Sequence, residues 1–455
     1  MIKSNECLND KKWVRWSALF IVAFTMMAAY YVNDVMAPLK SMLSSELNWN
    51  STEFGFFTGA YSFLNVFLLM LIWGGLILDR FGIRFTGKLA VILMVGGTMA
   101  EYYAITSLAG TSDMILGYKK DVFIASAGYS VFGVGAEVAG ITVTKIIAKW
   151  FNGKEMATAM GVQVALARIG SQAAYAVAIP VATAFHIDTP LLIGLFLLIG
   201  GMIAFFCFSL MDCKLDKQIQ VQDNGSDEDK FSFEDVKHVI TNPGFWLIAL
   251  LCVLFYSCVF PFQKYATELM TIKYHVDPNL AGLVAGLPAL GALLLTPIFG
   301  GLIDKRGKAA SIMMYGAGML IFVHGVYSLP FITNWLVAIV MMIILGIAFS
   351  LVPSAMWPSV AKIFPVKQLG TAYALIFFIQ NIGLWGVPAL IGWVLDTYCI
   401  IGKTPEGTNL YDYTMPMCIF TFIASLSLFI AFLLKVADRK FGYNLEKANI
   451  KKSEN

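Results

Sequence analysis

The sequence predicts an all-α membrane protein with twelve transmembrane helices in two pseudo-symmetric halves of six. Three observations lead to this fold class: the apolar composition, the number of long apolar runs, and a repeat that relates the two halves. Of the 455 residues, 58% are hydrophobic and only 13% are charged. Soluble chains carry about 25% charged residues, so the composition indicates a polytopic helical membrane protein.

Twelve apolar runs are long enough to cross a bilayer, which requires roughly 20 residues of helix. They lie at 13–35, 51–78, 86–107, 121–149, 158–184, 190–211, 244–271, 278–303, 309–331, 333–364, 370–396 and 413–436. The polar interval 212–243 divides them into two sets of six. We therefore expect a bundle over 1–211, a cytoplasmic linker over 212–243, a second bundle over 244–436 and a cytoplasmic tail over 437–455.

The distribution of Lys and Arg predicts the orientation. Placing both termini in the cytoplasm puts 25 of the 32 basic residues on that side, as the excess of positive charge in cytoplasmic loops requires. Six others, Lys264 among them, are assigned to outer segments. Arg168 is left over, because it lies inside an apolar run and has no nearby helix end from which its guanidinium could reach water.

A repeat relates the two halves. The segment GLILDRFG at 75–82, after the second run, matches GGLIDKRG at 300–307, after the eighth. A second set of matches, offset by 213 positions, aligns Arg168 with Asn381. In transporters built from such repeats the binding site lies near the membrane midplane, between the repeats.

Glu137 and Arg168 are the charges that most need an explanation. They lie 12 and 10 residues from the inner ends of adjacent runs, or roughly 18 Å and 15 Å deep. Charges at that depth are rare and indicate a functional site. In one interpretation Arg168 binds a carboxylate and Glu137 an ammonium group. Alternatively the two form a structural salt bridge, or Glu137 carries a proton.

Further candidate binding residues lie on neighbouring runs. Tyr61 and Asn65 are four apart and share a helix face, and Tyr129 lies about two turns from Glu137. Tyr61 and Asn65 could instead serve contacts between helices. In the second half the candidates are Trp357, Gln380 and Asn381.

Another group is assigned to conformational control rather than binding. Asp79, Arg80, Asp304 and Arg306 belong to the two repeated loops at the inner surface, where an Asp can cap a helix or pair across the halves. Pro261 and Pro358 are expected to break the seventh and tenth runs; such breaks suit gates, although they could be simple kinks. Glu101 and His324 are interpreted as lying outside the site.

The doubled Gly-x-x-x-Asp-(Arg/Lys) loops and the six-plus-six arrangement resemble the major facilitator superfamily. A closer resemblance is to its lysosomal dipeptide uniporter branch (the major facilitator superfamily domain-containing type one proteins) and their bacterial relatives. The motifs that carry it are YS at 61–62 with Asn65, FGVGAE at 132–137, WF at 150–151, GKE at 153–155, ARIGS at 167–171, VFPF at 259–262, WP at 357–358, QLGTAY at 368–373 and IQN at 379–381.

This resemblance implies passive dipeptide transport by alternating access, with Glu137 and Arg168 holding the two ends of the peptide. Two features depart from the branch. Leu64 stands where a proline is expected, and the short N-terminus has no dileucine signal, which favours a bacterial inner membrane or plasma membrane over a lysosome. The alternatives are a proton-coupled symporter of a peptide, amino acid or organic carboxylate, and a non-transporting scaffold or sensor.

Other classes of function lack support in the sequence. The seven cysteines are scattered and form no CxxC or Cys/His cluster, so neither a metal site nor a disulfide framework is expected. No nucleophile triad or phosphate-binding loop is present, which argues against an enzyme and against a cofactor. The net charge of +3 gives no reason to expect nucleic acid. The expected partners are a small zwitterionic solute and the lipid bilayer, and we expect a monomer.

Overall fold

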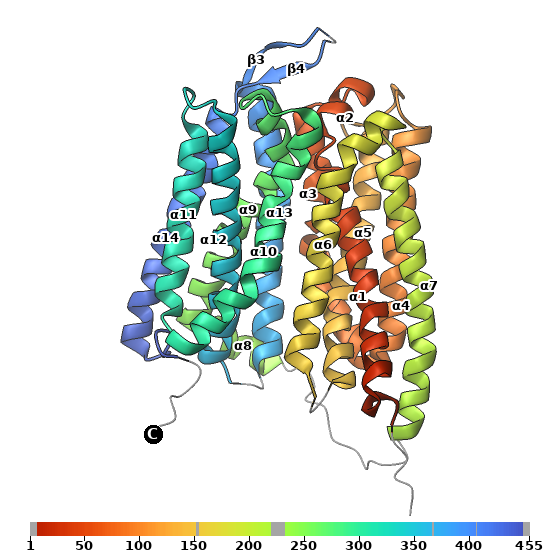
Figure 1. The fold of residues 1–455 in the computed structure, drawn as a ribbon, viewed down its shortest axis with the longest axis vertical. Helices are drawn as coiled ribbons and strands as arrows, with labels where there is room; N and C mark the ends of the chain where they lie inside the picture. The colour runs from red at the N-terminus through yellow and green to blue at the C-terminus, as the bar shows by residue number, and fades with distance from the viewer. Residues whose placement is uncertain (1–6, 152–153, 220–232, 366–367, 406, 449–455) are drawn as a thin grey trace, which may run out of the picture.

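The computed structural model describes residues 7–151, 154–219, 233–365, 368–405 and 407–448. Nearly all of the described chain is helical (Figure 1). Its elements are η1 (Leu8–Asp10), α1 (Lys12–Val35), α2 (Lys40–Leu47), α3 (Ser51–Phe67), α4 (Met70–Ser107), β1 (Met114–Ile115), β2 (Tyr118–Lys119), α5 (Lys120–Trp150), α6 (Met156–Ala184), α7 (Thr189–Ile219), α8 (Phe233–Thr241), α9 (Pro243–Ile272), α10 (Pro278–Arg306), α11 (Ala309–Ser328), α12 (Trp335–Ile363), α13 (Leu369–Tyr398), β3 (Ile400–Lys403), β4 (Asn409–Tyr411) and α14 (Thr414–Phe441).

The helices form two bundles that stand side by side (Figure 1), α1 to α7 in the first half and α9 to α14 in the second. Within the described residues, eleven helices are long and apolar enough to span a membrane. A twelfth crossing is formed by α3, which has 17 residues, together with the start of α4. The predicted all-α fold in two halves is confirmed, and the protein is a multi-pass membrane protein.

The second crossing differs from the single run 51–78 that the sequence predicts. Helix α3 ends at Phe67, and Leu69 adopts a left-handed conformation (φ 53°, ψ 34°) before α4 begins. Helix α4 then contains a second break at Gly82 (φ 73°, ψ 174°), a conformation that glycine adopts readily because it has no Cβ. The second crossing therefore consists of α3 and the residues up to Gly82, and the third begins after it.

Two other boundary expectations need correction. Helix α7 continues to Ile219, because Asp212 accepts hydrogen bonds from Lys149 Nζ (2.8 Å) and Trp150 Nε1 (2.9 Å) and so packs residues after 211 against the bundle. Helices α9 and α12 run without interruption past Pro261 and Pro358; membrane helices tolerate proline where neighbouring groups satisfy the freed backbone. Residues 220–232, within the expected linker, and 449–455, at the end of the expected tail, lie outside the described residues.

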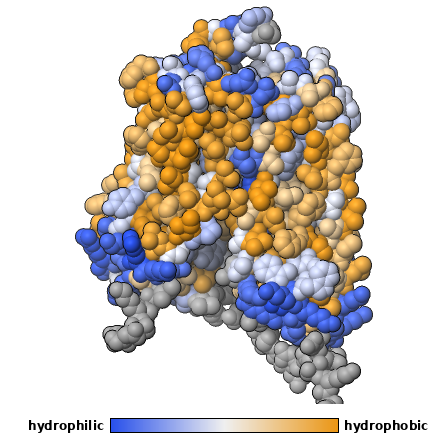
Figure 2. Space-filling view, viewed as in Figure 1, coloured by the Kyte–Doolittle hydropathy of each residue, from blue (hydrophilic) through white to orange (hydrophobic). Residues whose placement is uncertain are grey.

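The two halves touch mainly at one end. We call the end that carries η1 and the last turn of α14 the terminal end, and the opposite end, with α2 and the two hairpins, the far end (Figure 1). Towards the far end α6 packs on α10, and a Cβ at Gly282 would overlap the Tyr175 carbonyl oxygen. A Cβ at Gly161 or Gly301, further towards the terminal end, would meet no atom within 4 Å. Figure 2 shows the surface hollowed between the halves at the terminal end.

Polar contacts reinforce the closed far end. Lys40 of α2 pairs with Glu268 of α9, a contact in which both side chains are 4% exposed, and Tyr413 donates to the same carboxylate. Asp396, near the end of α13, accepts hydrogen bonds from the backbone N–H groups of Ser51 and Thr52 at the start of α3. The contacts of Lys40 with Glu268 and of Asp396 with α3 join the first half to the second, so the structure is one in which the far end is closed.

Candidate functional site

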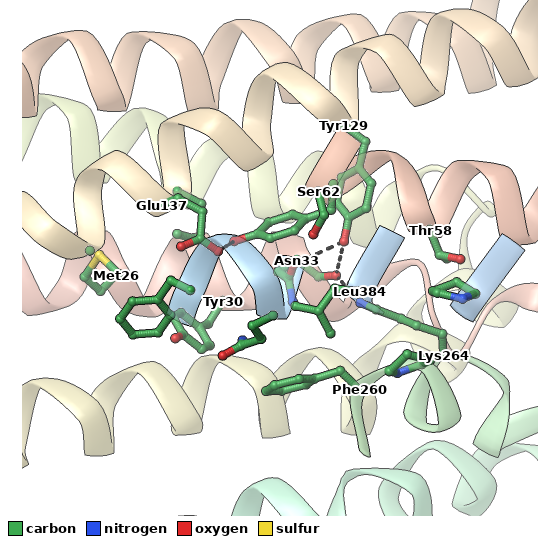
Figure 3. Close-up of a pocket in the computed structure, with 18 residues that line it drawn as sticks. Met26, Tyr30, Asn33, Thr58, Ser62, Tyr129, Glu137, Phe260, Lys264 and Leu384 are labelled. Carbon is green, nitrogen blue, oxygen red and sulfur yellow. Dashed lines mark hydrogen bonds between the residues drawn. The ribbon is translucent and has the colours of Figure 1, made fainter. Parts of the chain in front are cut away.

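A cavity lies between the two halves, at the middle of the helices. Its wall is formed by α1, α3 and α5 of the first half and by α9 and α13 of the second. Two charged side chains belong to the described wall, Glu137 and Lys264, and Figure 3 shows them towards opposite ends of the cavity. The remainder mixes polar groups with apolar side chains such as Met26, Phe260 and Leu384.

Glu137 reaches the cavity from α5 and is partly buried. Tyr61 Oη of α3 donates a hydrogen bond of 3.1 Å to Glu137 Oε1. Gly133, one turn earlier on α5, allows this approach, because a Cβ there would overlap the Tyr61 carbonyl oxygen. No base of the described chain lies within 4.0 Å of the Glu137 carboxyl group, which leaves it available to a cation from the cavity.

Arg168 lies beside the cavity rather than in its wall. Its guanidinium is 5.6 Å from the centre of the Tyr30 ring and 4.9 Å from that of Phe349; Tyr30 belongs to the cavity wall. Gly170 lets α6 approach α1, since a Cβ there would overlap the Met27 carbonyl oxygen. No carboxylate of the described residues lies within 4.0 Å of Arg168. The alternative of a structural salt bridge with Glu137 is therefore not realised in this state.

Two other predicted residues contribute to the wall. Tyr129 lines the cavity and its hydroxyl donates to Asn33 O (2.7 Å). Gln380 lines it from α13, and its amide oxygen accepts a hydrogen bond from Cys252 Sγ (3.3 Å). Pro261, assigned to gating from the sequence, also belongs to the wall.

The remaining candidates lie behind the wall. Asn65 is 1% exposed, and its side-chain atoms have no hydrogen-bond partner in the described chain. Asn381 is equally buried and donates to Phe377 O (3.0 Å). Trp357 stacks on the Phe377 ring at 4.8 Å and donates to Tyr256 Oη (3.3 Å). Since Phe377 itself lines the cavity, Trp357 and Asn381 support the wall from behind.

Lys264 is the residue that sequence analysis placed wrongly. It lies inside α9, eight residues before Ile272, and is 9% exposed. Its Nζ donates to Asn33 O (2.7 Å) and Asp34 Oδ1 (3.0 Å) of α1. Like Arg168, Lys264 lies inside an apolar run of the sequence. Its distance from the end of that run could therefore have indicated a buried position, but from the sequence alone we expect its side chain to reach the outer surface.

The four charged residues assigned to conformational control lie away from the cavity, at the terminal end. Asp79 pairs with Lys145 of α5 at 3.2 Å, and the Arg80 guanidinium is 5.5 Å from the centre of the neighbouring Phe81 ring. Asp304 and Arg306 lie in the last turn of α10. None of the four lines the central cavity.

Two helical bundles that enclose a central cavity, closed at one end, define the class of membrane transport proteins that work by alternating access. A family model described as "Major Facilitator Superfamily" matches residues 19–388. The chain belongs to the Major Facilitator Superfamily, which confirms the resemblance seen in the sequence.

Similar proteins with curated names include the lysosomal dipeptide transporter MFSD1 of mouse, 27% identical over 443 residues, which cover 95% of this chain and 88% of that protein. The human protein of the same name is 27% identical over 447 residues, with coverages of 95% and 88%. The inner membrane transport protein YdiN of Escherichia coli is 25% identical over 213 residues, 45% of this chain and 47% of that protein.

Solved structures agree in fold. The D-xylose–proton symporter superposes with a TM-score of 0.69 at 15% identity, covering 91% of this chain and 97% of that one. A bacterial homologue of the human lysosomal transporter Spinster, in an inward-facing and unoccupied conformation, gives a TM-score of 0.62 at 14% identity over 97% of this chain and 100% of that one. At these identities the likeness concerns the fold alone.

Proposed function

We propose that the protein is a dipeptide uniporter, in which Glu137 holds the amino end of the peptide and Arg168 its carboxylate. The observation that carries the proposal is that Glu137 lines the same cavity as Tyr30, whose ring centre is 5.6 Å from the Arg168 guanidinium, and neither charge has a counter-ion within 4.0 Å among the described residues. Two unpaired opposite charges beside one cavity suit a zwitterion. The names of the MFSD1 relatives support a dipeptide as that zwitterion.

Each end of a peptide has a matching group. The Glu137 carboxylate accepts from an ammonium, and Tyr61 holds it by a hydrogen bond of 3.1 Å. Arg168 offers the planar fork of donors that pairs with a carboxylate in two hydrogen bonds. Apolar side chains in the wall, such as Phe260 and Leu384, would accommodate peptide side chains without selecting one polar type.

The transport cycle follows from the closed far end. We place the terminal end in the cytoplasm, supported by the bases there, including Lys149, Lys154 and Arg439. The structure then corresponds to the inward-facing state, and rocking of the halves would open the far end to the outside. The protein acts in this proposal as a carrier without enzymatic chemistry.

A proton-coupled symporter is the second candidate. The observation in its favour is that Tyr61 is the one described partner of Glu137, so no cation holds that carboxyl group in the charged form. A proton could then occupy it in place of an ammonium group. The two candidates differ in their response to a pH gradient.

The test is counterflow in proteoliposomes loaded with dipeptides, free amino acids or monocarboxylates, with and without a pH gradient. Exchange of dipeptides that is indifferent to the gradient is the expected result. Uptake that requires the gradient would replace uniport with symport, and transport of monocarboxylates without dipeptides would overturn the assignment of the substrate.

A further inference from the structure

Lys264 is a buried cation that joins the two halves at the far side of the cavity. Its ammonium group on α9 binds Asn33 O and Asp34 Oδ1 on α1, and its side chain is 11% exposed. Tyr129 donates to the same Asn33 carbonyl oxygen, and Figure 3 shows Lys264, Asn33 and Tyr129 gathered at the end of the cavity away from Glu137.

The ammonium group is not saturated by these contacts. A lysine ammonium has three N–H donors, and the described chain supplies two acceptors, at 2.7 Å and 3.0 Å. Lys264 belongs to the cavity wall, so an anion in the cavity can reach it. If an anion displaced Asp34 from Lys264, the Asp34 carboxylate would keep one hydrogen-bond partner, because Asn33 Nδ2 donates to its Oδ1 at 2.8 Å.

Opening of the far end must break the contact between Lys264 and Asp34, because α9 and α1 belong to different halves. A buried charge that loses its partner is strongly destabilised. An anion that takes the place of Asp34 at Lys264 in the open state would therefore be bound favourably. Two groups can supply it: a carboxylate in the cavity, or Glu101, which is fully buried and whose carboxyl oxygens have no hydrogen-bond partner in the described chain.

The spacing of the charges suits a peptide. Glu137 and Tyr129 are eight residues apart on α5, which is about 12 Å along the helix, and Lys264 shares the Asn33 carbonyl oxygen with Tyr129. An extended dipeptide spans about 7 Å, and a hydrogen bond at each end adds about 3 Å. A dipeptide with its amine on Glu137 is thus long enough for its carboxylate to reach the region of Lys264, which becomes free to bind it once the contact with Asp34 breaks.

We propose that Lys264 binds the carboxylate of the peptide in the outward-open state, and that closure of the far end passes this carboxylate to Arg168 while Asp34 takes its place on Lys264. This inference rests on the proposed dipeptide transport. It assigns one cation to each state: Lys264 is free to bind when the far end is open, and Arg168 is free in the closed state described above.

The test compares Lys264→Met with Asp34→Asn. The half-saturating concentration of labelled dialanine is measured in right-side-out and in inverted membrane vesicles, together with competition by its C-terminal amide. Lys264→Met should raise the half-saturating concentration about tenfold from the outer face, as expected for the loss of one hydrogen bond between charged groups, and less than threefold from the inner face. Asp34→Asn should leave it unchanged or lower it from the outer face, because Lys264 is then free.

Three control variants keep the test decisive. Lys403→Met removes an exposed lysine of β3 at the far end and should change neither value. Lys264→Arg keeps the charge and should retain most of the outer-face affinity, which guards against simple misfolding of Lys264→Met. Glu101→Gln should have little effect on either face; a loss as large as that of Lys264→Met would assign Glu101 as the partner and overturn the proposal.

The remaining outcomes are also distinct. If Lys264→Met weakens binding equally from both faces, Lys264 does not bind the carboxylate. The same conclusion follows if amidation of dialanine weakens its binding by the same factor in the wild type and in Lys264→Met. A wild-type protein that exchanges no dipeptide from either face would instead overturn the proposed function, and this inference with it.

Discussion

The guanidinium of Arg168 lies 5.6 Å from the centre of the Tyr30 ring and has no carboxylate within 4.0 Å among the described residues. The ring faces of Tyr30 and Phe349 stabilise the cation without neutralising it. Arg168 thus keeps its capacity to pair with a carboxylate beside the central cavity.

The first prediction concerns the fork of Arg168. Arg168→Lys retains the charge but loses the paired N–H donors and the flat contact with Tyr30 and Phe349. The half-saturating concentration for dipeptide counterflow should rise about tenfold, and that for the C-terminal amide of the same peptide should change less. Equal values for the wild type and Arg168→Lys would show that the fork does not hold the carboxylate.

The second prediction concerns the hydroxyl of Tyr61, which donates to Glu137. Tyr61→Phe removes that hydrogen bond and leaves the ring contact with Phe132 in place. Dipeptide affinity should fall about fivefold, because a hydrogen bond contributes about 1 kcal/mol. Tyr103→Phe, at an exposed tyrosine of α4, is the matched control; the same loss there would rule out a specific role for Tyr61.

The third prediction tests closure of the far end. Gly282→Ala would place a methyl group against the Tyr175 carbonyl oxygen of the other half, whereas Gly301→Ala on the same helix meets nothing within 4 Å. Gly282→Ala should favour the open far end, lengthen the distance between spin labels at Ser45 and Lys403, and slow exchange at least tenfold. Gly301→Ala should have none of these three effects. An unchanged distance in Gly282→Ala would contradict the closed contact described here.

The fourth prediction concerns pH at the terminal end. The guanidinium of Arg15 beside Glu155 (2.8 Å) lowers the pKa of that carboxyl group, and the hydrogen bond from Lys154 lowers the pKa of Asp10. The two pairs should therefore tether η1 and the first turn of α1 to Lys154 and Glu155 at pH values above the unfolded pKa of about 4. The tether should weaken as the pH falls through the lower, folded pKa values.

Spin-label mobility at Lys12 reports this tether. Mobility should increase in the wild type as the pH is lowered from 6 through the lowered pKa values of these two carboxyl groups. Glu155→Gln should already show increased mobility at pH 6 and a smaller response to acid. A label whose mobility does not change over this range in the wild type would contradict the account.

The fold could be predicted from the sequence because the features that determine it are repeated and long. Apolar runs of membrane-spanning length and the matched loops at 75–82 and 300–307 do not depend on details of packing. The break at Leu69 could not be predicted, since neither Gly nor Pro marks it. The continuity of α9 at Pro261 was likewise hidden, because the surroundings decide whether a proline interrupts a membrane helix.

The site was only partly predictable. The depth of Glu137 in its run predicts a group near the centre of the membrane, and in the structure its side chain lines the cavity. Which side chains face the cavity depends on how each helix is rotated about its axis, and the sequence does not specify this rotation. Asn65 and Asn381, for example, are buried behind the wall. The sequence alone assigns Lys264 to the outer surface, because it does not reveal the contact with Asp34, 230 positions away, that holds the side chain inside the protein.

The most direct test of the central claim, that Glu137 holds the amino end of the peptide, combines the Glu137→Gln variant with a peptide whose amine is blocked. Binding of dialanine and N-acetyl-dialanine to the wild type and to Glu137→Gln is measured by calorimetry, with Glu101→Gln as the matched control. The account predicts that acetylation weakens binding at least tenfold in the wild type and in Glu101→Gln, and has little further effect in Glu137→Gln. Equal binding of the free and acetylated peptides to the wild type would contradict it.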